Sequence, residues 1–181
     1  MELKQLLETN SLHFDDKFYE DCEIFIKLLQ QWGKVHNLSG RLSISDIEEN
    51  ILDSLYPLSF INDPGLILAS AQRDVKAYLI EPRVKRVSFL NFVKASLKLD
   101  NLTVLRHRVE DVKDLEVDLI TSRAVTNTKL LLDITKNIKK ENSSYLFYKG
   151  SMLEEELEIA KVNNYKIVNR KDRNYLYIKG K

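Results

Sequence analysis

The sequence is poor in the residues that mark disulfide-rich, disordered and membrane-spanning chains. It has one cysteine, five glycines and three prolines among its 181 residues. Cys22 cannot form a disulfide within the chain, and its helical surroundings predict a buried thiol in a reducing compartment. So little glycine and proline argues against a linker-rich or disordered chain. No apolar run approaches the ~20 residues that span a bilayer, and charged residues interrupt the N-terminal leucines, so we expect a cytoplasmic protein without membrane contact.

Neither sign of charge predominates, because the chain has 28 Lys and Arg residues and 27 Asp and Glu residues, which gives a net charge of +1. That balance excludes neither nucleic acid nor small molecules as partners, since local patches decide. A hydrophobic content of 44% with 30% charged residues is ordinary for one compact domain with its own core. The histidines His13, His36 and His107 show no ligand spacing, so no metal is expected.

Residues 1–62 predict a helical cap. Apolar residues at helical spacing indicate a long helix that Asp15 and Asp16 can cap and that ends near Gly33. A second helix is expected to begin at Ser45 or Asp46 and to run to residue 58.

Residues 63–181 alternate between helical and strand patterns and predict an α/β core. The expected helices are 66–71, 84–98, 130–138 and 152–162, and the expected strands are 77–81, 102–106, 117–120, 145–148, 166–169 and 175–178. A loop is expected at 121–124. Such alternation implies parallel strands with crossover helices, and the last two strands predict an antiparallel hairpin. The fold class is therefore α/β, a three-layer sandwich packed as one compact unit with a helical N-terminal extension.

Glu81 ends the first predicted strand, and basic residues and an amphipathic helix follow it at once. In open α/β sheets, ligands bind beyond the carboxyl ends of the strands, where an acid can hold both hydroxyls of a ribose. A nucleoside-containing cofactor is the resulting hypothesis. Taken alone, Glu81 is more easily explained as a surface glutamate at a strand end.

Polar groups also follow the next three strands, at Arg108-Val109-Glu110, Ser122-Arg123-Ala124 and Lys149-Gly150. The carboxyl ends of parallel strands meet at one edge of a sheet, which is what a shared cleft requires. Val109 and Glu110 can place a backbone amide and a carboxylate against a purine. Each residue alone is as well explained by solvation, and their recurrence favours the cleft.

An ordered series of motifs covers nearly the whole chain: Asn37-Leu38-Ser39, Ile51-Leu52-Asp53-Ser54-Leu55, Lys85-Arg86-Val87-Ser88-Phe89-Leu90, Arg108-Val109-Glu110, Ser122-Arg123-Ala124 and Tyr148-Lys149-Gly150. The series resembles the 16S rRNA guanine-N(7) methyltransferases, the RsmG/GidB family. Each tripeptide is weak evidence, but the ordered set is specific. The resemblance implies a Rossmann-like fold, S-adenosylmethionine as cofactor, and 16S ribosomal RNA or a small-subunit particle as partner of a monomeric enzyme.

The resemblance also assigns roles to residues. Arg123 and Lys149 take the catalytic positions, with Arg123 near the methionine end of the cofactor or the RNA and Lys149 facing the RNA or the target base. The cofactor-binding set is Gly65, Leu66, Glu81, Val109, Glu110 and Arg123, with Glu81 on the ribose and Val109 and Glu110 beside the adenine. Asn37, Asp53 and Ser54 support the mouth of the pocket, although Asp53 and Ser54 could instead brace the cap on the sheet. Basic clusters at 83–86, 106–108, 136–140 and 170–173 modestly support RNA binding, because a charge run is usually a solvated face.

The chain departs from the family pattern at two places. Asn50 stands where the family usually has a histidine. Between Phe60 and Gly65 the family's strand and glycine-rich loop have no counterpart, and only Pro64-Gly65-Leu66 resembles the end of that motif. The strand would be the centre of the sheet, so its loss should leave its neighbours unpaired.

Two explanations of the missing loop are open. Either the sequence omits residues that the natural protein has, which we favour because every downstream motif is kept, or the chain has lost them. The second explanation supports an alternative function, a non-catalytic RNA-binding or ribosome-assembly module on a methyltransferase scaffold. An NAD enzyme is a weaker alternative, because no Gly-x-Gly-x-x-Gly fingerprint precedes Glu81.

Overall fold

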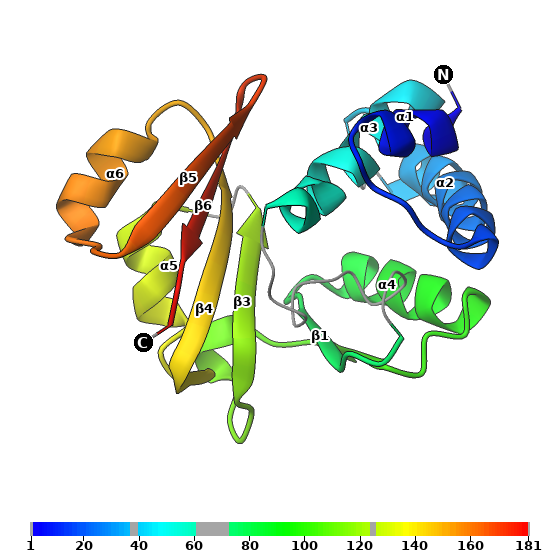
Figure 1. Ribbon diagram of the computed structural model, residues 1–181. Helices are drawn as coiled ribbons and strands as arrows, with labels where there is room; N and C mark the ends of the chain where they lie inside the picture. The colour runs from blue at the N-terminus through cyan, green and yellow to red at the C-terminus, as the bar shows by residue number, and fades with distance from the viewer. Residues whose placement is uncertain (1, 37–39, 61–72, 124–125, 181) are drawn as a thin grey trace. The chain divides into compact units, whose positions relative to one another are not determined.

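The computed structural model describes residues 2–36, 40–60, 73–123 and 126–180. The chain divides into two compact units, Met1–Arg106 and His107–Lys181. Each unit has its own sheet, and both are shown in Figure 1. The division of the sequence into a cap over 1–62 and a core over 63–181 stays a prediction.

The first unit contains four α-helices among its described residues: α1 (Leu3–Thr9), α2 (Asp16–His36), α3 (Ile44–Leu55) and α4 (Val84–Ser96). A 3₁₀ turn, η1 (Tyr56–Ser59), follows α3. The Asp15 carboxylate accepts a hydrogen bond of 2.8 Å from the Phe18 amide and caps α2, as expected. Ser43 caps α3 by accepting from the Asp46 amide at 3.1 Å, so this helix begins slightly before the predicted residues.

Helix α2 continues to His36, and the predicted end near Gly33 is wrong. A Cβ atom at Gly33 would lie 2.5 Å from Cδ2 of Leu42, so this glycine permits a close approach of the chain rather than a helix end. A glycine inside a helix costs only about 1 kcal/mol relative to alanine, which packing of the apolar face can offset. Leu7, Leu52 and Leu55 are almost completely buried in the core that α1, α2 and α3 share.

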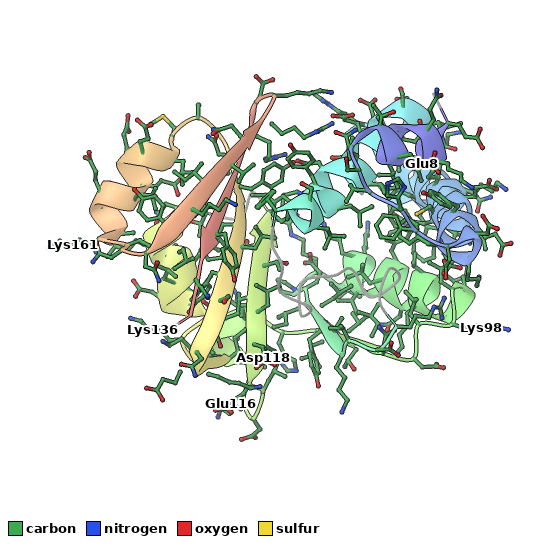
Figure 2. The ribbon with its side chains drawn as sticks, in the orientation of Figure 1. Glu8, Lys98, Glu116, Asp118, Lys136 and Lys161 are labelled. Carbon is green, nitrogen blue, oxygen red and sulfur yellow. The ribbon has the colours of Figure 1, made fainter. Side chains whose placement is uncertain are left out.

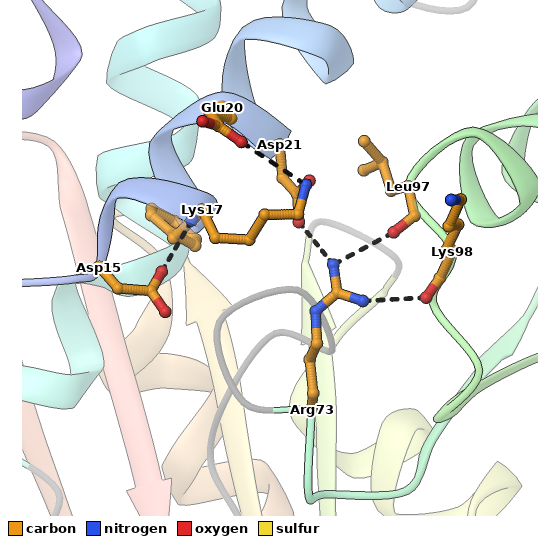
Figure 3. A network of polar contacts seen from close by, with 8 residues as sticks. Asp15, Lys17, Glu20, Asp21, Arg73, Leu97 and Lys98 are labelled. Carbon is orange, nitrogen blue, oxygen red and sulfur yellow. Dashed lines mark hydrogen bonds and ion pairs between the residues drawn. The ribbon is translucent and has the colours of Figure 1, made fainter.

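A polar network joins α2 to the end of α4 within the first unit (Figure 3). The Asp21 side chain is 1% exposed, and its two oxygens accept from Lys17 Nζ at 2.6 Å and from Arg73 Nη2 at 2.7 Å. Arg73 also donates to the carbonyl oxygens of Leu97 and Lys98, at 3.1 and 2.9 Å. These carbonyls lie where α4 ends and lacks intrahelical donors, so one guanidinium satisfies both the buried acid and the end of the helix.

The first sheet pairs β1 (Ala77–Ile80) with β2 (Leu102–Leu105) in parallel, in register from Ala77 opposite Leu102 to Ile80 opposite Leu105. Both strands and helix α4 confirm the sequence predictions. Among the described residues, β1 has a partner on one edge only, and its Tyr78 and Leu79 are 38% and 37% exposed. The predicted helix over 66–71 lies outside the described residues.

The second sheet has the strand order β3-β4-β6-β5. β3 (Val117–Arg123) runs parallel to β4 (Lys139–Lys149), and β6 (Arg173–Ile178) is antiparallel to both β4 and β5 (Tyr165–Arg170). The predicted closing hairpin is therefore confirmed. Helices α5 (Thr128–Ile134) and α6 (Leu153–Ala160) lie on the same side of this sheet (Figure 1).

Three predictions in this unit are wrong. The expected loop at 121–124 is strand through Arg123, because the residues from Thr121 to Arg123 pair with the residues from Leu146 to Tyr148 of β4. The expected helix over 130–138 ends at Ile134, and β4 begins at Lys139 rather than at 145. Polar residues such as Asp118 and Lys140 hid the strand pattern; they form an ion pair of 2.6 Å across β3 and β4, with Asp118 labelled in Figure 2.

Candidate functional site

Glu81 follows β1 directly, and the first turn of α4 holds its carboxylate in place. Its amide donates to Leu105 O at 3.0 Å, which continues the parallel ladder by one bond. Oε1 accepts from the Arg83 amide at 2.8 Å, and Oε2 lies 3.4 Å from Arg86 Nη1. A carboxylate has about four lone-pair sites, so these two contacts leave acceptors for a pair of hydroxyls. The side chain is 18% exposed, which leaves a ligand access to it.

Val109 and Glu110 lie in a 3₁₀ turn, η2 (Val109–Asp111), in the second unit. Asn137 Nδ2 donates to Val109 O at 2.8 Å and to Val112 O at 2.7 Å, so its amide fixes both ends of the turn. The Glu110 carboxylate is 43% exposed and lies 3.5 Å from Arg108 Nη1. No sequence pattern selects Asn137, which stands in a lysine-rich stretch.

Arg123 is the last residue of β3 and lies opposite Tyr148 of β4. The carbon at the centre of its guanidinium is 4.8 Å from the centroid of the Tyr148 ring, a cation–π distance that orients the charge at the carboxyl end of the strand. The neighbouring Ser122 Oγ is buried without a hydrogen-bond partner among the described residues.

Lys149 ends β4 and is only 6% exposed. Its Nζ donates to Thr126 O at 2.7 Å and to Glu156 Oε2 at 2.6 Å. The same Glu156 oxygen accepts from the amide and from the hydroxyl of Thr128, each at 2.7 Å. Burial raises the pKa of the Glu156 carboxyl, but the hydrogen bonds from Lys149 and Thr128 outweigh it and hold the pKa below its ordinary value.

Sequence reasoning missed Thr128 and Glu156. Asn127 gives a local signal for the first, because its side chain accepts from the Leu130 amide at 2.9 Å and caps α5 directly before Thr128. No such signal distinguishes Glu156 from the other glutamates of α6, Glu154, Glu155 and Glu158.

The remaining predicted positions lie on the first unit or outside the described residues. Asp53 and Ser54 belong to α3; Asp53 is 6% exposed, and Ser54 Oγ donates to Asn50 O of its own helix at 2.8 Å. Asn37, Gly65 and Leu66 lie outside the described residues. The structure thus brings Arg123 and Lys149 to the same edge of one sheet, while the assigned roles stay predictions.

Neither metal-binding nor membrane-spanning features are found in the described ranges. Within them, no three His, Cys, Asp or Glu side chains are grouped as metal ligands. The helices there are too short or too polar to cross a membrane.

Comparison with known proteins gives matches that span the chain. Residues 18–177 match the GidB family, described as rRNA small subunit methyltransferase G. A ribosomal RNA small subunit methyltransferase G of Aliarcobacter butzleri is 76% identical over 191 aligned positions, which cover 98% of both chains. The enzyme of the same name from Wolinella succinogenes is 38% identical, again over 98% of both.

Solved structures are more distant. A mutant of MtNAS has a TM-score of 0.51 at 12% identity and covers 91% of this chain and 75% of its own. A methyltransferase from Geobacter sulfurreducens has a TM-score of 0.48 at 10% identity and covers 98% of this chain and 87% of its own.

The alignment with the Aliarcobacter butzleri relative also shows a difference in length. It has 191 positions, whereas this chain has 181 residues, so the relative has at least ten residues without a counterpart here. A gap of that size agrees with the missing strand and glycine-rich loop. The family match over 18–177 and the 76% identity confirm the resemblance seen in the motifs. The chain therefore belongs to the RsmG/GidB family of small-subunit rRNA methyltransferases, with the mixed α/β, Rossmann-like fold of S-adenosylmethionine-dependent methyltransferases.

Proposed function

We propose that the protein transfers a methyl group from S-adenosylmethionine to N7 of a guanine in 16S ribosomal RNA, either free or in a small-subunit particle. The observation that carries the proposal is the 76% identity, over 98% of both chains, to a protein named for small-subunit rRNA methylation. We further propose that it acts as a monomer in the cytoplasm. The buried, unpaired Cys22 agrees with a reducing compartment.

Each unit by itself carries groups that suit one part of the cofactor. Glu81 offers carboxylate oxygens for the ribose hydroxyls, and the turn at Val109–Asp111 offers a fixed backbone for the adenine. The family's glycine-rich loop, which would let the backbone approach the cofactor closely, has no counterpart between Phe60 and Gly65. S-adenosylmethionine, when bound, supplies an electrophilic methyl group on a sulfonium.

Methyl transfer to guanine N7 needs little acid–base catalysis by the protein. Guanine N7 is a hydrogen-bond acceptor with a free lone pair, so no proton has to be removed before it attacks. Alignment of the base with the methyl group is then the main contribution, and such positioning is worth about 7–11 kcal/mol in favourable cases. Arg123, oriented on the Tyr148 ring, is suited to an RNA phosphate or the methionine carboxylate. We assign Asp53 and Ser54 a supporting role at the pocket mouth.

The test is methyl transfer from radiolabelled S-adenosylmethionine to 16S rRNA and to small-subunit particles that lack the modification. We expect label in the RNA, recovered as 7-methylguanine, and a strong loss with Glu81→Gln. Lys27→Met is the control, because Lys27 is on the exposed side of α2, in an ion pair of 4.0 Å. Label in another nucleotide or in no nucleotide contradicts the proposal.

The alternative function, a non-catalytic RNA-binding module, rests on the shorter chain. The Aliarcobacter butzleri relative has at least ten residues that this chain lacks, and this sequence also lacks the family's glycine-rich cofactor loop. Calorimetric titration separates the two functions. Saturable binding of S-adenosylmethionine at one site per chain supports the enzyme, whereas RNA binding without any cofactor binding supports the module.

A further inference from the structure

We infer that Lys149 is a positioning residue: with Glu156 it holds Thr126 and Thr128 at the start of α5, and it does not itself contact RNA or the target base. We call Lys149, Thr126, Thr128 and Glu156 the lysine clasp. The inference deepens the proposed function and rests on it for its kinetic readouts. Its structural readouts do not depend on methyl transfer.

The ammonium of Lys149 has few hydrogen-bond donors and little exposed surface left for a ligand. A lysine has three N–H donors. Two of them are used at 2.7 and 2.6 Å by Thr126 O and Glu156 Oε2, and the charge lies 5.9 Å from the centroid of the Phe147 ring. With 6% of the residue exposed, a phosphate could reach Nζ only by displacing these partners.

Glu156 makes the clasp a unit rather than a chance contact. One of its oxygens accepts three hydrogen bonds, two from Thr128 and one from Lys149, all between 2.6 and 2.7 Å. Thr128 is completely buried at the start of α5. Lys149 is buried and Glu156 partly so, and removing one member of such an ion pair leaves the other charge without compensation. Lys149 and Glu156 should therefore act together.

The clasp is attached to the segment that leaves Arg123. β3 ends at Arg123, and Thr126 O, three residues later, is an acceptor of Lys149. On the β4 side, Tyr148 precedes Lys149 and carries the Arg123 guanidinium on its ring. Lys149 therefore fixes Thr126, three residues after Arg123, and directly follows the tyrosine whose ring carries the Arg123 guanidinium. A shift at either contact would misplace the charge that we assign to the substrate.

Four variants and a control test the inference: Lys149→Met, Lys149→Arg, Glu156→Gln, the double variant of Lys149→Met with Glu156→Gln, and Lys140→Met. The control removes a more exposed ion pair of 2.6 Å, which Lys140 of β4 makes with Asp118 of β3. For RNA methylation we expect kcat to fall about 100-fold in Lys149→Met and in Glu156→Gln. A loss of about that size follows when a group that positions the substrate is displaced by about 1 Å. The KM for RNA should change little, the double variant should be no worse than the worse single one, and Lys149→Arg should recover most of kcat.

Two further measurements test the inference even if a variant is poorly stable or inactive, because neither depends on methyl transfer. Hydrogen exchange of the folded fraction should show loss of protection at residues 126–131 in Lys149→Met and Glu156→Gln, and none in Lys140→Met. The salt dependence of RNA binding should keep its slope in Lys149→Met, because a lost phosphate contact lowers that slope by about one.

The results that overturn the inference are specific. They are a salt slope reduced by about one in Lys149→Met, a full kcat in Glu156→Gln, or unchanged exchange at 126–131. If the parent protein, without any substitution, methylates no RNA, the proposed function fails. Loss of protection at 126–131 with an unchanged salt slope would still support the clasp in that case.

Discussion

Glu156 shows how one partly buried residue links stability to pH. Its folded-state pKa lies below the ordinary 4.5, because the hydrogen bonds from Lys149 and Thr128 outweigh the burial that raises it. A carboxyl group with a depressed folded pKa stabilises the fold above its unfolded pKa. That contribution is lost as the pH falls from the unfolded pKa through the folded pKa.

We therefore predict that Glu156→Gln lowers the free energy of unfolding at pH 7 and flattens its fall below pH 4.5, the ordinary pKa of the group. Replacing one hydrogen-bonded, partly buried charge should cost about 1–3 kcal/mol. Urea unfolding at a series of pH values measures both effects. Glu155→Gln is the matched control, because Glu155 is an exposed neighbour in the same helix. Equal slopes in Glu156→Gln and the parent below pH 4.5 would contradict the linkage.

Cys22 gives a second prediction for a single side chain. It is 7% exposed, and burial, assisted by the Asp21 carboxylate, raises the pKa of its thiol to about 12. Because the thiolate is the reactive form, the native protein should not react with a disulfide reagent at pH 8. In denaturing urea it should release one equivalent of the reagent's thiol, since the chain has one cysteine. Equal rates in the native and unfolded protein would refute the buried thiol.

At the scale of elements, the Asp21–Arg73 contact should stabilise the first unit more than an exposed ion pair does. Asp21 is 1% exposed, and Arg73 also binds two carbonyls at the end of α4. We predict that Arg73→Met costs about 1–3 kcal/mol, because it leaves a buried acceptor with Lys17 alone. Lys27→Met, in an exposed pair of the same helix α2, should cost less than about 1 kcal/mol. Urea midpoints by Trp32 fluorescence compare the two, and equal losses would contradict the prediction.

The element boundaries show what the sequence can predict. Strands β1 and β2 are short apolar runs followed by polar residues, and both were predicted to within one residue. The start of β4 was missed because Lys139, Lys140 and Glu141 look like loop residues. Their strand conformation depends on pairing with β3, a contact distant in sequence that no local pattern encodes.

The candidate site follows the same rule. Glu81, Arg123 and Lys149 could be placed at strand ends, because strand ends are visible in the sequence. The burial of Lys149 and its bond to Glu156 could not be predicted, since they depend on how α6 packs on the sheet. An exposed and a buried lysine at a strand end look the same in a sequence.

For the whole molecule, the main feature is the division into two sheets. Among the described residues, β1 pairs only with β2, and β3 pairs only with β4. The family's missing strand would be central, flanked on both sides, and the Aliarcobacter butzleri relative has at least ten residues that this chain lacks. The two units therefore have no strand ladder in common within the described ranges.

We predict that the chain unfolds in two steps and that the relative's extra residues, inserted between Phe60 and Gly65, make unfolding cooperative. Trp32, the single tryptophan, reports on the first unit, and hydrogen exchange of β4 reports on the second. Their urea midpoints should differ in the parent and coincide in the insertion variant. The added loop should also tighten S-adenosylmethionine binding about tenfold, the effect of one or two hydrogen bonds to its backbone amides.

An insertion of the same length made of glycine and serine is the control, because it adds chain without a strand. If only the relative's residues join the two transitions and improve binding, the missing segment acts as the central strand of one sheet. If both insertions behave alike, its role is only that of a spacer. Coincident transitions in the parent would mean that the two units are already coupled without that strand, and would contradict the prediction of two-step unfolding.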